Sequence, residues 1–361
     1  MVLEAVPQPM LAKAIAELPN GADWQFEPKW DGFRAIADRR HGVTIHSRSG
    51  RPLERYFPEV AEALEKTLPS GVVIDGEIII PTERGCDFDL LTARIHPAAS
   101  RVTRLAAETP AVFVAFDLLA VDARDERHRP LAERVLLLDE VLAANDRSES
   151  VGSVLRTPST RDQAEARDWF SRFEGAGLDG IVAKQIDGAY VGGARTWGKL
   201  KHHRSADCVL AGYRMHKDGA GVGALLLGLH DDAERLHYVG AIGAFSAATR
   251  RDLLEDLADE ALGVDDSEHP WLIDNPAAHG IRIPGELNRW NAKKMRDWVA
   301  VPPERVVEVE FDQLQSNRFR HNAKLVRWRT DRTAASCTMH QLEVASPVEL
   351  RAFINDTSSK S

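Results

Sequence analysis

The pattern of apolar residues changes abruptly near residues 204–206. Before this point, strand-like apolar runs are interrupted by segments with helical spacing. After it, short strand-like runs separated by turn residues dominate, and one segment alone has helical spacing. A chain of 361 residues is long enough for about two domains. The change therefore predicts a mixed domain over residues 1–204 and a strand-rich domain over 205–350, and the polar segment 351–361 is expected to form a flexible tail.

The strand-rich part has a pattern typical of a small β-barrel. The expected strands are 208–215, 224–230, 235–243, 305–314 and 324–330. One helix is expected over 246–262, and Ser246 is a suitable N-cap for it. Five strands and one helix suit a closed barrel of the oligonucleotide-binding (OB) type.

The mixed part combines strands that are joined by turns with separate helical segments. Its expected strands are 24–30, 33–39, 42–48, 72–80, 111–122 and 178–185. Its expected helices are 58–68, 131–145 and 160–177.

Composition excludes several classes of protein. No run of eighteen or more apolar residues is present, which argues against a membrane span. The N-terminus lacks the basic start and long apolar core of a secretion signal. The three cysteines, Cys86, Cys208 and Cys337, are far apart, so they predict neither a disulfide framework nor a zinc site and fit a reducing cytoplasm.

Charge is distributed unevenly along the chain. The net charge of −9 argues, taken alone, against a nucleic-acid partner. However, residues 199–204 and 317–332 are strongly basic, and the second segment includes Phe319 and Trp328. Basic and aromatic side chains together suit phosphate contact and base stacking. A solvated basic face with two half-buried aromatic side chains explains the second segment equally well.

Five short motifs occur in one order. They are Lys29-Trp30-Asp31-Gly32-Phe33-Arg34, then "DGEIII" with Glu77, "FDLL" with Phe116 and Asp117, "DGIVAK" with Asp179 and Lys184, and "KLK" with Lys199 and Lys201. Each motif alone is more simply a turn or one face of an edge strand. The order and spacing of all five, however, resemble the covalent nucleotidyltransferases and most closely the ATP-dependent DNA ligases.

The resemblance extends over nearly the whole chain, from about Gln8 to Cys337. Residues 88–102 and 204–213 resemble ligase segments, and "RWRTDR" (327–332) resembles the C-terminal motif of the family. The short two-domain form resembles the bacterial ligase C type. The resemblance implies an α+β fold, in which an adenylation domain of antiparallel sheets with flanking helices is followed by an OB-fold barrel.

The resemblance also implies a reaction, the sealing of 3′-hydroxyl/5′-phosphate nicks in duplex DNA through a lysyl-AMP intermediate. Lys29 would attack the α-phosphate of ATP, and the AMP would then pass to the 5′ phosphate of the nick. A lysine must be neutral to attack, and neighbouring cations and a bound divalent metal disfavour its protonated form. Lys199, Lys201 and Arg34 are the candidate neighbours, which would also stabilise charge on the phosphate oxygens.

The remaining roles follow the pattern of the family. In the nucleotide site, Glu27 would help hold the adenine through the backbone, Phe116 and Val182 would stack on its two faces, and Lys184 would also bind the cofactor. Glu77 would accept from a ribose hydroxyl or lie near the metal, and Asp179 would help hold Mg²⁺, for which Mn²⁺ is a substitute. Arg48 would contact the 5′ phosphate of the nick. Arg329, Asp331 and Arg332 would act on the pyrophosphate of ATP when the barrel folds over the nucleotide. For Phe116 a plain core position, and for Arg48 an exposed loop position, explain the sequence as well.

Two residues depart from the pattern of the family. Asp179 stands where much of the family has Glu, and its shorter side chain favours a water-mediated contact with the metal. Arg332 stands where many relatives have Lys, which keeps the charge but changes the shape. Neither departure removes a required group.

Three other functions share these features. An mRNA capping guanylyltransferase and an RNA ligase have the same lysine chemistry, and an inactive DNA-binding clamp would keep only the fold. The "FDLLTARIHP" segment argues against the capping enzyme, and the presence of Lys29, Glu77, Lys199 and Lys201 together argues against the clamp. The expected partners are nicked duplex DNA and other DNA repair proteins, with a monomeric chain in the bacterial cytoplasm, at the nucleoid.

Overall fold

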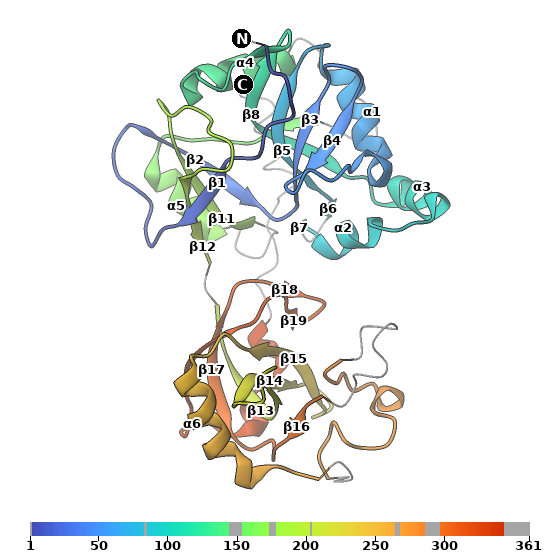
Figure 1. Cartoon of the computed structure of the whole chain (residues 1–361), viewed down its shortest axis with the longest axis vertical. Helices are drawn as coiled ribbons and strands as arrows, with labels where there is room; N and C mark the ends of the chain where they lie inside the picture. Colours follow the sequence, from blue (N-terminus) through green and yellow to red (C-terminus); the bar gives the residue numbers. More distant parts are fainter. Residues whose placement is uncertain are drawn as a thin grey trace. The chain divides into compact units, whose positions relative to one another are not determined.

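The computed structural model describes residues 2–82, 85–143, 154–172, 178–202, 204–263, 268–285 and 297–342. The described residues up to His202 form one compact unit, and those from Arg204 to Leu342 form a second (Figure 1). Among the described residues, no helix is both long and apolar enough to cross a membrane. The expected tail at 351–361 lies outside the described residues.

The first unit is built around a large, mostly antiparallel sheet. Its strands are β3 (Phe33–Asp38), β4 (Thr44–Ser47), β5 (Val73–Ile79), β8 (Val112–Val121), β9 (Arg124–Asp125) and β10 (Val154–Arg156). Their order is β10-β8-β5-β3-β4, with β9 paired to β8, and β10 alone runs parallel to its neighbour β8. A small hairpin of β6 (Pro81–Thr82) and β7 (Gly85–Cys86) follows β5 in the chain.

Helices cover one face of this sheet (Figure 1). They are η1 (Glu54–Tyr56), α1 (Pro58–Thr67), α2 (Phe88–Arg94) and α4 (Leu131–Ala143), while α3 (Ala99–Glu108) packs against α1 and α2. Val60 and Leu64 of α1 and Leu138 of α4 pack with Ile45 and Phe113 of the strands in one buried cluster. The alternation of β-strand side chains sends the other set of residues to the opposite face.

A second sheet of four strands belongs to the same unit. In spatial order it contains β1 (Leu11–Ala14), β12 (Arg195–Lys201), β11 (Leu178–Gln185) and β2 (Trp24–Trp30). Helix α5 (Gln163–Arg172) packs beside it, with Trp169 in a cluster that includes Phe26 and Ile181. A further buried cluster joins Ile36 and Phe116 of the large sheet to Trp197 of the small one. The two sheets therefore face each other.

The second unit is a small β-barrel. Strands β13 (Arg204–Met215), β14 (Val222–His230), β15 (Leu236–Ile242), β17 (Val306–Phe311) and β20 (Lys324–Trp328) lie in the order β15-β14-β13-β17-β20. β16 (Val299–Ala300) pairs with β13, and β18 (Leu314–Gln315) pairs with β19 (Arg318–Phe319). A bridge between Ile242 and Ala323 brings the two edge strands together. The short helices are α6 (Ala247–Leu257), η2 (Ala258–Glu260), η3 (Pro276–His279), η5 (Ala334–Ser336) and η6 (Met339–Leu342).

The predicted fold class, antiparallel sheets with flanking helices followed by an OB-fold barrel, is confirmed. Ser246 caps α6 as expected, because its Oγ accepts a hydrogen bond from the Thr249 amide at 3.1 Å. The helix expected at 160–177 begins at Gln163 instead, because Thr160 forms a β-bridge with Phe26. Its expected end at Gly177 lies outside the described residues.

Two further differences between the prediction and the structure concern the start of the first barrel strand and two helices that were not predicted. The first strand of the barrel starts at Arg204, where it pairs with Phe311, rather than at Cys208. Helices α2 and α3 were not predicted as helices, because each is short and Pro97 lies between them. The side chain of Asp87 caps α2 by accepting from the Asp89 and Leu90 amides.

Candidate active site

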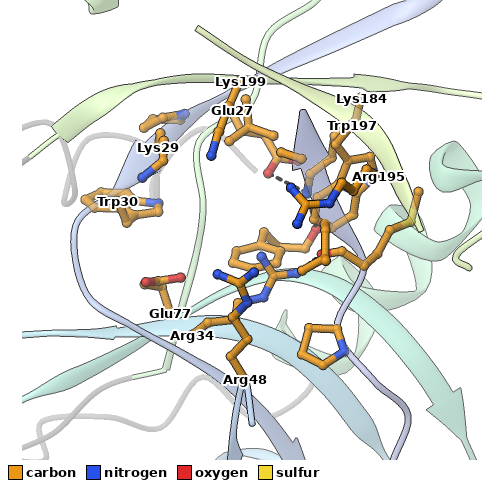
Figure 2. A pocket seen from close by; sticks show the side chains of 17 residues that line it. Glu27, Lys29, Trp30, Arg34, Arg48, Glu77, Lys184, Arg195, Trp197 and Lys199 are labelled. Carbon is orange, nitrogen blue, oxygen red and sulfur yellow. Dashed lines mark hydrogen bonds and ion pairs between the residues drawn. The ribbon is translucent and has the colours of Figure 1, made fainter. Parts of the chain in front are cut away.

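A cavity of about 210 Å³ lies between the two sheets of the first unit. Figure 2 shows Lys29 and Lys199 on one side of it, and Arg34, Arg48 and Glu77 on the other. Eight charged side chains line it, six basic and two acidic, and they are Lys29, Arg34, Arg48, Lys184, Arg195, Lys199, Glu27 and Glu77. This excess of positive charge suits a polyanionic ligand.

The small sheet supplies one wall through its strand register. Val182 of β11 lies opposite Glu27 of β2 and Lys199 of β12, so these three side chains form a row on one face. Lys29 and Lys184 follow two residues further along their strands and therefore point to the same face. All five line the cavity.

Asp179 reaches this face through a local irregularity of β11. Ile181 and Ala183 point into the apolar cluster behind the sheet, and simple alternation would place Asp179 with them. The pairing of β11 with β2 shifts register between Leu178 and Ile181, and Gly180 has a φ of +136°. A bulge of this kind re-aims a side chain. As a result, Asp179 Oδ2 lies 2.5 Å from Lys29 Nζ and 3.0 Å from Lys201 Nζ.

The large sheet supplies the opposite wall. Arg34 of β3 is paired in register with Glu77 of β5. The guanidinium of Arg34 donates two hydrogen bonds to Asp75, at 2.7 and 2.6 Å, and Tyr190 donates a third at 2.6 Å. Burial raises the pKa of Glu77 to about 7, although Arg34 and Lys29 act against this rise. Glu77 therefore changes its charge near neutral pH.

Phe116 of β8 lines the cavity. The register between β8 and β5 shifts at this position, so no residue of β5 is paired with Phe116. The guanidinium of Arg34 lies 4.4 Å and Lys184 Nζ 4.5 Å from the centre of its ring. Lys184 Nζ also donates to the Phe116 carbonyl oxygen at 3.1 Å and pairs with Glu27 at 2.7 Å. Lys184 thereby connects the two walls.

Three basic side chains of the cavity make no ion pair with any described residue. They are Arg48, Arg195 and Lys199, and each lines the cavity. Burial, reinforced by Lys201 and Lys29, lowers the pKa of Lys199. The remaining cations are balanced, Arg34 by Asp75, Lys184 by Glu27, and Lys29 by Asp179. The three are therefore available to a phosphate group.

Four residues of this site were not predicted from the sequence, and they are Asp75, Tyr190, Arg195 and Trp197. Arg195 and Trp197 precede Lys199 by four and two residues on β12, so strand alternation could have identified them. Asp75 precedes Glu77 by two residues and was equally accessible to that argument. Tyr190 gave no local signal, because its partner Met10 is 180 residues away in the chain.

Arg329, Asp331 and Arg332 lie in the second unit, not in this cavity. Arg329 donates to both oxygens of Asp207, at 2.9 and 3.1 Å, and to Asp331. Arg332 Nε lies 3.3 Å from Asp207 Oδ2. The three residues thus form one group around Asp207, and their expected role stays a prediction.

Two carboxylates suit a divalent cation that also binds phosphate, because Glu77 lines the cavity and Asp179 lies next to it, against Lys29. Asp179 Oδ2 is buried and accepts no hydrogen bond of regular geometry from a described residue. It forms ion pairs with the ammonium groups of Lys29 and Lys201. The described residues contain no cluster of three or more metal-ligating side chains. Mg²⁺ fits such a site, because it usually binds one or two carboxylates, substrate phosphates and several waters.

Comparison with known proteins identifies the family. Residues 9–201 match the "ATP dependent DNA ligase domain", and residues 218–332 match the "ATP dependent DNA ligase C terminal region". DNA ligase C2 of Mycolicibacterium smegmatis is 48% identical over 93% of this chain and 94% of its own length. DNA ligase C of Mycobacterium tuberculosis is 48% identical over 98% of this chain and 99% of its own length.

The fold comparison agrees with the sequence comparison. A solved structure of a Lig E DNA ligase matches with a TM-score of 0.56 and 17% identity, over 90% of this chain and 100% of that one. At that identity the likeness concerns the fold alone. On the sequence matches, the chain belongs to the ATP-dependent DNA ligases, and among them to the ligase C type.

Proposed function

We propose that this DNA ligase seals nicks through an AMP group carried on Lys29. The observation that carries this proposal is the position of Lys29 at a positively charged cavity, with Lys199 beside it and the Asp179 carboxylate 2.5 Å from its amine. The amine attacks the α-phosphate of ATP, a P–N bond forms, and the bond to pyrophosphate breaks. The AMP then passes to the 5′ phosphate of the nick, and the 3′ hydroxyl finally displaces it.

The adenosine lies against Phe116 and Val182 in this proposal. Both side chains line the cavity, and Glu27 lies next to Val182 across the β2–β11 pair. Lys184 is held by Glu27 and by the Phe116 carbonyl, so it fixes the base pocket as well as contributing charge. Arg34 and Glu77 face the ribose from the large sheet.

Asp179 and Glu77 are the residues that would hold Mg²⁺ or Mn²⁺. When bound, the cation neutralises phosphate charge and stabilises the leaving pyrophosphate. In the ion pair with Asp179, the amine of Lys29 is not free to attack. Lys29 must leave this pair before it becomes a nucleophile.

The phosphates of ATP and of DNA have separate candidate partners. Lys199 and Lys201 act on the α-phosphate, and Arg332, supported by Arg329 and Asp331, acts on the pyrophosphate. Arg48 binds the 5′ phosphate of the nick. In support of this last role, Arg48 lines both the main cavity and a neighbouring cavity of about 490 Å³, so it lies where the two meet.

The cellular role that we propose is DNA repair by a monomer in the bacterial cytoplasm, at the nucleoid, together with other repair proteins. An RNA ligase or a capping guanylyltransferase would share the lysine chemistry. Sealing assays on nicked duplexes separate these functions when the 3′ end is DNA or RNA and the nucleotide is ATP or GTP. We expect sealing of nicked DNA with ATP and Mg²⁺. Lysine labelling by GTP alone, or sealing of RNA alone, would contradict the proposal.

A further inference from the structure

Asp207 occupies a fixed position at the start of the barrel. It lies on β13, in register with Glu308 of β17, and 9% of its surface is exposed. The side chain of Gln341 accepts from the Asp207 amide at 2.9 Å and donates to its carbonyl oxygen at 3.1 Å. The strand register and this backbone clamp leave the carboxylate little freedom.

The carboxylate of Asp207 meets two arginines of the C-terminal motif, and their surroundings differ. Arg329 donates to both oxygens of Asp207, donates twice to Asp331 at 2.8 Å, and lies 3.5 Å from Glu308. Its side chain is 15% exposed, and its amide donates to the Val306 carbonyl oxygen. Three carboxylates thus balance the charge of Arg329, which suits an anchor better than a ligand contact.

Arg332 has one carboxylate partner among the described residues, and its side chain is 38% exposed. The contact runs from Nε to Asp207 Oδ2 at 3.3 Å. A guanidinium has five N–H donors in a rigid fork, so this contact leaves donors for a second anion. The ion pair therefore restricts the side chain of Arg332 without saturating it.

We propose that Asp207 is a positioning residue for lysine adenylation: it anchors the motif through Arg329 and orients Arg332 for the pyrophosphate leaving group. This inference rests on the proposed role of Arg332. An arginine that is already oriented stabilises charge developing on the leaving group without reorganising during the reaction. Asp207 itself touches neither nucleotide nor DNA, and it acts through Arg332.

Two rates are measured for each variant of the full chain. The first is the rate of lysine adenylation with ATP and Mg²⁺. The second is the rate of sealing of a nick whose 5′ end is already adenylated. Asp207→Ala should slow adenylation at least ~10-fold, because a catalytic group misplaced by about 1 Å can lose ~100-fold in rate. Sealing of the adenylated nick, which releases no pyrophosphate, should change less than about twofold. In the Arg332→Ala background, Asp207→Ala should have no further effect on adenylation, because the two residues act as one unit.

Two more variants separate orientation from folding. Asp256→Asn removes a carboxylate of the same unit that pairs with Arg305 rather than with Arg329 or Arg332, and it should leave both rates unchanged. Asp207→Asn keeps an acceptor oxygen at the same place, so this variant should fold even if Asp207→Ala does not. It should slow lysine adenylation but not the sealing of the adenylated nick.

The possible failures are distinguishable. If Arg332→Ala slows adenylation and Asp207→Ala and Asp207→Asn do not, the role of Asp207 is wrong and that of Arg332 stands. If Arg332→Ala leaves adenylation intact, the role of Arg332 is wrong and Asp207 has nothing to orient. Equal losses in both rates, or additive losses in the double variant, would make Asp207 a purely structural residue.

Discussion

Gly180 determines where the carboxylate of Asp179 points. Its φ of +136° lies in a region that residues with a side chain rarely adopt. A Cβ at this position would lie 1.9 Å from the Leu200 carbonyl oxygen, which is backbone and cannot move aside. The Asp-Gly pair thus does more than make a turn, because it brings a carboxylate to Lys29, the proposed nucleophile.

Replacing Gly180 by alanine should therefore damage the site. We expect Gly180→Ala to cost about 1–3 kcal/mol of stability through backbone strain and to slow adenylation at least ~10-fold through the displaced Asp179. Gly263→Ala is the matched control, because a Cβ there meets nothing within 4 Å. Thermal unfolding and the adenylation rate measure the two effects. Normal adenylation by Gly180→Ala would show that the position of Asp179 is unimportant.

Glu77 predicts a dependence of stability on pH. Burial raises its pKa from 4.5 to about 7, so the folded protein binds this proton more tightly than the unfolded chain does. The stabilisation that the protonated carboxyl of Glu77 provides is fully present below pH 4.5, and it is lost as the pH rises through 7. Glu77→Gln cannot ionise, so between pH 5 and pH 8 its stability relative to the wild type should rise by about 1 kcal/mol, after solvent screening. Denaturant unfolding at both pH values measures this, and a difference of opposite sign would contradict it.

Among the strands, one buried lysine connects the two sheets around the cavity. Lys184 of β11 and Glu27 of β2 are almost fully buried and lie 2.7 Å apart. The same ammonium donates to the Phe116 carbonyl on β8 of the large sheet. Burial lowers the pKa of Lys184, and Glu27 counteracts this.

Removing one partner of this ion pair should destabilise the protein much more than removing both partners. Lys184→Met leaves the Glu27 carboxylate buried without its partner and should destabilise the protein by about 3 kcal/mol. The double variant Lys184→Met/Glu27→Gln removes both charges and should recover most of that loss. The midpoints of thermal unfolding of the two variants provide the measurement. An additive, larger loss in the double variant would show that the pair itself is strongly stabilising.

The sequence predicted strands and their faces better than it predicted contacts between distant segments. Alternation along β2 and β12 places Glu27 with Lys29 and Lys199 with Lys201, as the motifs suggested. Alternation could not place Asp179, because the bulge at Gly180 reverses its face. Nor could it place Tyr190 against Met10, because that contact forms only when the Gly-rich loop near 192 folds onto the segment near 9.

At the scale of the whole molecule, the basic segment 317–332 is less available to DNA than its charge suggests. Arg327 pairs with Glu308 at 2.6 Å, Lys324 lies 3.4 Å from Glu310, and Arg329 is held by Asp207. We therefore expect part of the DNA contact to come from cations such as Arg48, which makes no ion pair with a described residue. The net charge of −9 does not prevent binding, because contact with phosphate depends on local charge.

Binding to nicked duplex should weaken as salt increases. Each lost phosphate contact should lower the slope of log K against log salt by about 0.9, so Arg48→Ala should show one such decrease. Arg104→Ala is the control, because Arg104 is exposed on α3 and pairs with Glu108. Titrations at several salt concentrations give the slopes. An affinity that does not change with salt would argue against DNA phosphate as the main contact.

Peptide mass spectrometry tests directly whether Lys29 carries the AMP. The protein is incubated with ATP and Mg²⁺, digested, and analysed by peptide mass spectrometry, with Lys29→Ala treated identically. We expect an AMP adduct on Lys29, no adduct in Lys29→Ala, and no ATP-dependent sealing by that variant. An adduct on another lysine, or full sealing by Lys29→Ala, would contradict it.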